Sequence, residues 1–152
     1  MNIDILDLLK TIETASLSKD TDFFCSSRDI FQARLDSYIL HSEQYLPAAI
    51  IGEIGNNTFD HNWDFEDGHA RGTYFNVDYN EYIVLADFGR GLKKSLSAVK
   101  TCKSDLEAIK TAFTEHISGR APEQRGNGLK FVCESVKEKN GCSIFNQVLH
   151  VV

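Results

Sequence analysis

Two glycine-rich stretches carry the residues of this sequence that best suit ligand binding. The segment 125-RGNGL-129 opens a predicted helix, and a glycine-rich helix start offers free N–H groups and the positive end of the helix dipole. That chemistry favours phosphate. The segment 87-DFGRG-91 follows an apolar run, so Asp87 ends a predicted strand where a carboxylate can face a ligand crevice. Its glycines allow backbone to approach a flat or anionic group.

A third candidate is the polar face of 48-AAIIGEIGNNTFDHN-62. Four residues share one helical face: Glu53, Asn56, Asn57 and Asp60. A solvated face is the ordinary interpretation, but the two asparagines are poor helix formers and the face has no Lys or Arg to pair with its carboxylates. Gly52 and Gly55 each cost about 1 kcal/mol relative to Ala in a helix. Close approach of another group would compensate for that cost.

Several familiar motifs are excluded. The chain has no G-x-x-x-x-G-K-[ST] phosphate loop and no G-x-G-x-x-G. A calcium loop starting at Asp60 fails, because Phe65 and Arg71 stand where Gly and Glu are needed. Acidic and histidine side chains in the following loop could bind a transition metal, although a solvated loop is the simpler interpretation. These are His61, Asp64, Glu66, Asp67 and His69.

The elements that must position these residues follow from hydrophobic periodicity and capping signals. The pattern predicts helices over 3–17, 27–46 and 47–61, strands over 73–79 and 82–87, helices over 104–118 and 129–139, and a last strand over 142–152. Ser27 and Ser104 are the expected caps, and Pro47 suits a first helical turn. The strand over 82–87 is continuously apolar, which predicts burial on both faces. This order predicts an α+β fold.

Composition narrows the class of protein. The 152 residues suffice for one domain, and the net charge of -6 argues against nucleic acid as a partner. Four cysteines without a Cys-x-x-Cys pair indicate reduced thiols in an intracellular protein. The N-terminus is acidic and amphipathic, unlike a signal peptide, and the apolar runs are too short to span a membrane. We therefore expect a cytoplasmic protein.

Taken in order, Glu53-x-x-x-Asn57, Asp87-x-Gly89-x-Gly91 and Gly126-x-Gly128-Leu129 resemble the nucleotide-binding boxes of the GHKL superfamily of gyrase, chaperone, histidine-kinase and mismatch-repair ATPases. The stand-alone anti-sigma-factor kinases are most similar. The resemblance covers 46–152 and implies a two-layer sandwich of the Bergerat type, with helices on one face of a small, mixed, mostly antiparallel sheet. It also implies an ATP lid over about 92–125, and we expect the helical segment 1–45 to pack on the same domain.

The resemblance implies roles for individual residues. Glu53 would orient or deprotonate the attacking water or hydroxyl, Asn57 would bind Mg²⁺, and Asp87 would accept a hydrogen bond from the adenine amino group. Gly89 and Gly91 would shape the adenine pocket. Further nucleotide contacts are implied at Asp60, His61, Arg120, Arg125, Gly126, Asn127, Gly128 and Leu129. Arg120 and Arg125 also fit ordinary surface arginines of a loop.

Three functions stay open at this point. The first is a slow ATPase or a Ser/Thr protein kinase that uses ATP and Mg²⁺ and regulates a partner protein. The second is a module that binds ATP without hydrolysis and is read by a partner, and the third is an interaction domain whose boxes have decayed. Thr58 and Asn127 depart from the residues usual in the superfamily. The sequence leaves the oligomeric state open, with a homodimer among the alternatives.

Overall fold

The computed structural model describes residues 4–18, 22–61, 72–79, 82–115 and 128–138. The chain forms two compact units, residues 1–89 and residues 90–152. The first contains α1 (Ile5–Ser18), β1 (Phe24–Cys25), α2 (Arg28–Ser42), α3 (Tyr45–His61), β2 (Thr73–Tyr79) and β3 (Tyr82–Ala86). The second contains α4 (Gly91–Leu96), α5 (Asp105–Thr114) and α6 (Gly128–Glu138). The predicted α+β class is confirmed.

The sheet of the first unit is antiparallel, with the described strands in the order β1-β2-β3. Tyr74 of β2 lies opposite Phe24 of β1 and opposite Ala86 of β3. Neighbouring residues of a strand point to opposite faces. Tyr74 and Phe75 therefore face different layers of helix, and both are almost fully buried.

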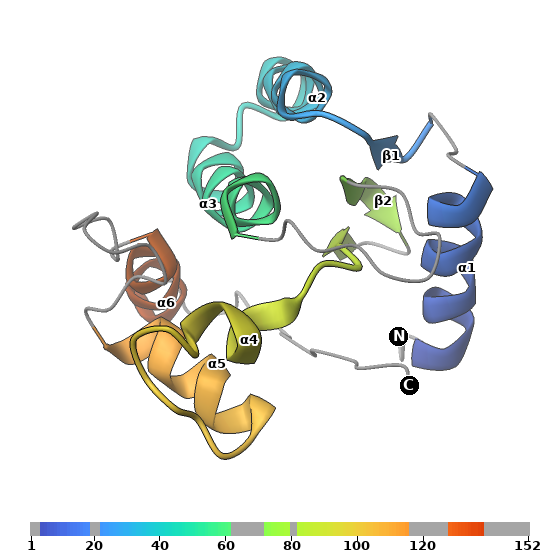
Figure 1. Ribbon diagram of the computed structural model, residues 1–152. Helices are drawn as coiled ribbons and strands as arrows, with labels where there is room; N and C mark the ends of the chain where they lie inside the picture. Colours follow the sequence, from blue (N-terminus) through green and yellow to red (C-terminus); the bar gives the residue numbers. More distant parts are fainter. Residues whose placement is uncertain (1–3, 19–21, 62–71, 80–81, 116–127, 139–152) are drawn as a thin grey trace. The chain divides into compact units, whose positions relative to one another are not determined.

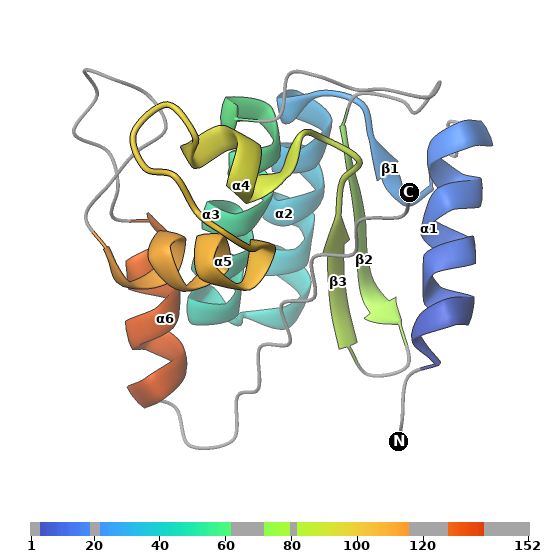
Figure 2. The same cartoon turned by 60° about the horizontal axis from the view of Figure 1, so that its bottom comes forward.

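Helices cover both faces of this sheet (Figures 1 and 2). On one face, Phe75 packs with residues of α2 and α3, among them Phe31, Leu35 and Ile51. On the other, Tyr74 packs with Ile12 of α1. The prediction that helices lie on one face only is therefore wrong for α1. Its apolar positions follow one side of a helix, but periodicity cannot say which face of a sheet that side will cover.

Helix starts agree with the predictions better than helix ends. The Ser27 hydroxyl accepts a hydrogen bond from the amide of Ile30 and caps α2, as expected. The helix ends at Ser42 rather than near residue 46, because Glu43 adopts a left-handed conformation with φ 55°. A new helix, α3, begins at Tyr45, which places Pro47 in its first turn.

The strand predictions over 73–79 and 82–87 are confirmed in position. The prediction that the second strand is buried on both faces is wrong for β3. It lies at the end of the described strand order, its residues are half-buried or exposed, and Ile83 is 39% exposed. The short β1 had no clear sequence signal, because two residues are too few for an alternating pattern. The predicted last strand over 142–152 lies outside the described residues.

Gly52 and Gly55 lie where α3 packs against α2. A Cβ atom at Gly55 would lie 2.1 Å from Cζ of Phe31, and one at Gly52 would lie 3.3 Å from Cδ2 of Leu35. The close approach expected at these glycines is therefore confirmed. It comes from the neighbouring helix, so the glycines give no indication of a ligand.

The second unit has a small core of its own. Leu96, Cys102, Ala108 and Ala112 are buried together, with Leu129 of α6 packed against them. The predicted cap of α5 is confirmed, since the Ser104 hydroxyl accepts from the amide of Glu107. The Glu107 carboxylate accepts from the Lys103 amide, which holds the chain entering the helix.

Candidate functional site

Asp87 follows the last residue of β3, and its carboxylate accepts hydrogen bonds from Thr58 and Gly89. The Thr58 hydroxyl donates to Oδ2 at 2.8 Å, and the Gly89 amide donates to Oδ1 at 2.9 Å. Thr58 is buried in α3, whereas Asp87 and Gly89 are half-buried. The carboxylate is thereby fixed between a helix and a glycine turn, and it keeps some exposure to solvent.

The Thr58–Asp87 hydrogen bond brings together two of the three predicted boxes. Asn57 precedes Thr58 in α3, so the helix box and the strand-end carboxylate belong to one region of the first unit. Glu53 is exposed and Asn57 is half-buried. Among the described residues, neither side chain makes a hydrogen bond or an ion pair.

Asp60 differs from Glu53 because it has a basic partner. Its carboxylate forms an ion pair with Arg28 of α2, and the Arg28 guanidinium also lies 6.0 Å from the centre of the Phe59 ring. The expectation that no basic residue pairs with this face is wrong for Asp60, since the partner comes from another helix. Contact between Asp60 and nucleotide stays a prediction, as does contact with His61, the last residue of α3, whose side chain is outside the described part.

The glycines after Asp87 have different local roles. Gly89 donates its amide to Asp87, which closes a tight turn. Gly91 has φ 74°, a left-handed conformation that favours glycine, and a Cβ there would have no atom within 4 Å. Gly91 therefore allows a backbone turn at the start of α4. Its part in an adenine pocket stays a prediction.

The third predicted box belongs to the second unit. Gly128 is the first residue of α6, and the next residue, Leu129, packs against the small core. A glycine-rich helix start was predicted here, and α6 does begin there. Four other predicted ligand contacts lie outside the described residues: Arg120, Arg125, Gly126 and Asn127. The assembly of all three boxes into one site stays a prediction.

Lys130, in the first turn of α6, was not among the predicted site residues. The residue is 8% exposed, and its Nζ atom is buried without a hydrogen-bond partner among the described residues. Burial lowers the pKa of Lys130, although Glu134 opposes this shift. A buried ammonium needs a partner, and an anion at the helix start would supply one. A lysine directly after a glycine-rich helix start was the available sequence signal.

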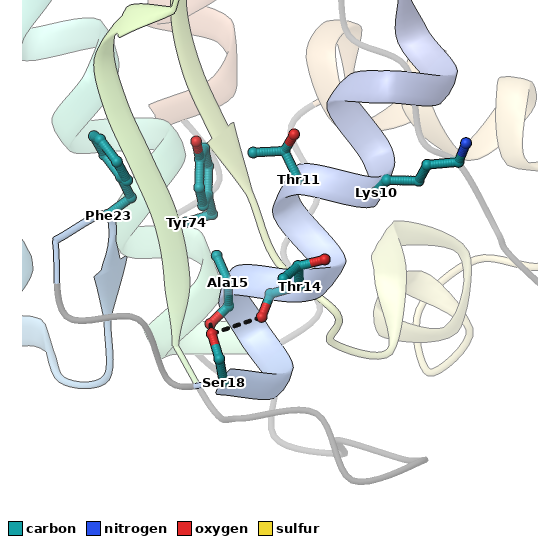
Figure 3. A pocket seen from close by; sticks show the side chains of 7 residues that line it. All are labelled: Lys10, Thr11, Thr14, Ala15, Ser18, Phe23 and Tyr74. Carbon is teal, nitrogen blue, oxygen red and sulfur yellow. Dashed lines mark hydrogen bonds between the residues drawn. The ribbon is translucent and has the colours of Figure 1, made fainter.

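The hollow along α1 is a different place from the predicted site. It has a volume of about 360 Å³ and is lined by Lys10, Thr11, Thr14, Ala15, Ser18, Phe23 and Tyr74. Figure 3 shows Lys10 extending away from the two aromatic rings. The Thr11 and Ser18 hydroxyls donate to carbonyls one turn earlier in α1. This hollow contains none of the predicted ligand-binding residues.

The described residues hold no ready-made metal site, because nowhere among them do three His, Cys, Asp or Glu side chains gather closely enough. The polar loop considered for a transition metal, residues 61–69, falls largely outside the described part. Within the described ranges, every helix is too short or too polar to cross a membrane.

Comparison with models of known protein families, with curated proteins and with solved structures finds no match to this chain. Its function must therefore be inferred from its own residues and contacts. The contact that bears most directly on function is the hydrogen bond from Thr58 of α3 to Asp87.

Proposed function

We propose that this chain is a GHKL-type domain that binds ATP and Mg²⁺ and acts on, or together with, another protein. The observation that carries the proposal is the position of Asp87, a half-buried carboxylate at the end of β3 held beside the box of α3. The Thr58 hydroxyl and the Gly89 amide hold this carboxylate in one orientation, in which it can act as an acceptor for an adenine amino group. The small antiparallel sheet with α2 and α3 on one face is consistent with this assignment, whereas α1 on the other face departs from it.

The α3 box fits the phosphate and metal end of such a ligand. Mg²⁺ takes oxygen ligands and keeps several for water and phosphate, which suits a single amide oxygen from Asn57. Glu53 lies one turn earlier, exposed and unpaired among the described residues, as a general base or water-orienting group should be.

The reaction we propose is slow ATP hydrolysis or phosphate transfer to a Ser or Thr of the partner. Glu53 favours turnover over mere binding, because a domain that only binds ATP could lose this carboxylate. Free thiols at Cys25, Cys102 and Cys133 agree with a reducing compartment, and we propose the cytoplasm.

Calorimetry with Mg-ATP on the folded full chain tests the proposal. Wild type should bind, and Asp87→Asn should bind at least about tenfold more weakly, because an amide nitrogen now faces the adenine amino group. Asp78→Asn is the control, since it removes an exposed carboxylate from β2 of the same unit. If folded wild type does not bind ATP, the proposed function is wrong.

A further inference from the structure

The hydroxyl of Thr58 is used differently from four other hydroxyls in the described helices. Thr11, Ser18, Ser42 and Thr114 donate to the carbonyl four residues earlier in their own helices. Thr58 instead donates across the fold to Asp87, 29 residues away in the chain.

Thr58 and Gly89 donate to different oxygens of Asp87. Thr58 binds Oδ2, and the Gly89 amide binds Oδ1. Donors from separate elements, one on each oxygen, help to fix both the plane and the rotamer of the carboxylate. Thr58 is only 4% exposed, so water cannot readily replace its hydroxyl.

We propose that Thr58 is a positioning residue that determines nucleobase specificity by holding Asp87 as a fixed hydrogen-bond acceptor. The proposal rests on the proposed function, in which Asp87 reads the purine. A hydroxyl has one proton, and Thr58 has committed it to Asp87. Thr58 and Asp87 therefore present hydrogen-bond acceptors, and no donor, to a ligand. The pair suits a purine with an amino group at its 6-position and opposes one with a 6-oxo group, which is itself an acceptor.

The discriminating ligands are Mg-ATP and Mg-inosine triphosphate, which differ in having an amino or an oxo group at the 6-position. We expect folded wild type to bind ATP at least about tenfold more tightly, because a site built around a hydrogen bond rejects the ligand that cannot make it. In Thr58→Val this preference should fall several-fold, mostly through weaker ATP binding. Thr58→Ser keeps the hydroxyl and should therefore retain the wild-type preference for ATP.

Thr73→Val is the matched control. Thr73 is a buried threonine of β2 whose hydroxyl donates at 3.2 Å to the carbonyl of Ala86, the residue just before Asp87. Losing this bond should cost stability and leave the ATP preference unchanged. If Thr58 had only a structural role, Thr58→Val would also leave the ATP preference unchanged. It would then weaken the binding of ATP and of inosine triphosphate equally. That result would overturn the proposal.

Two further outcomes separate the proposal from the function beneath it. If wild type binds ATP and inosine triphosphate equally well, Thr58 and Asp87 do not select the base, and the specificity proposal is wrong while nucleotide binding stands. This measurement needs no variant, so the test survives if Thr58→Val does not fold. If wild type binds neither nucleotide, both the proposed function and the role of Thr58 are wrong.

Discussion

The ring of Phe31 occupies the space where a side chain at Gly55 would begin. A Cβ atom at Gly55 would lie 2.1 Å from Cζ and 2.6 Å from Cε2 of that ring. Phe31 is fully buried, and its ring packs edge-on against Phe75 with 5.4 Å between the ring centres. Gly55 is therefore the point at which α2, α3 and the sheet come together.

This contact predicts that Gly55→Ala destabilises the protein by roughly 1–3 kcal/mol, the usual cost of overpacking a core. Helix propensity alone would predict a gain of up to about 1 kcal/mol. Urea denaturation measures the difference. Gly52→Ala is the control, because its Cβ would lie 3.3 Å from the flexible end of Leu35. Equal stability of the two variants would contradict the packing explanation.

The Arg28–Asp60 ion pair should contribute little to stability. Its side chains are 49% and 34% exposed, and pairs at such positions contribute about 0–1 kcal/mol. We expect a double-mutant cycle with Arg28→Gln and Asp60→Asn to give a coupling energy in that range, decreasing with added salt. The same variants test the predicted contact of Asp60 with nucleotide. If that contact exists, Asp60→Asn should weaken ATP binding more than Arg28→Gln does, and equal affinities would contradict it.

Lys130 should make stability depend on pH in the alkaline range. Burial lowers its pKa in the folded protein, so the unfolded chain binds the proton more tightly. Stability should therefore rise as pH increases from below the folded pKa toward the ordinary lysine value of about 10.4. Lys130→Met should be more stable than wild type at neutral pH, and this advantage should shrink as pH rises.

Denaturant titrations between about pH 7 and pH 10 would measure that advantage. Lys137→Met, at an exposed position in the last turn of α6, is the control for removing a lysine from this helix. A constant difference between Lys130→Met and wild type would show that Lys130 is not shifted by burial.

Glu53→Gln should separate binding from turnover. The side chain is exposed and unpaired among the described residues, so the change should leave stability and ATP affinity nearly unchanged. Removing a general base typically costs about 10²–10⁴ in rate. Phosphate release from labelled ATP, with and without cell extract, measures turnover, and Glu13→Gln of α1 is the control. Equal turnover in wild type and Glu53→Gln would leave an ATP-gated interaction module as the better interpretation.

Features set by short stretches of chain could be predicted from the sequence. Ser27 and Ser104 cap their helices, and Asp87 follows a strand, because caps and strand periodicity involve residues only a few positions apart. The same local logic identified the polar face of α3. It did not identify β1, whose two residues pair with a strand about fifty residues later.

Contacts between distant residues needed the tertiary structure. The sequence by itself determined that Gly55 must meet a close neighbour, that Asp60 is a carboxylate on a polar face, and that residue 58 carries a hydroxyl. Only the tertiary structure decided that these partners are Phe31, Arg28 and Asp87. Helical spacing defines which side chains share a face, but the fold decides what that face meets.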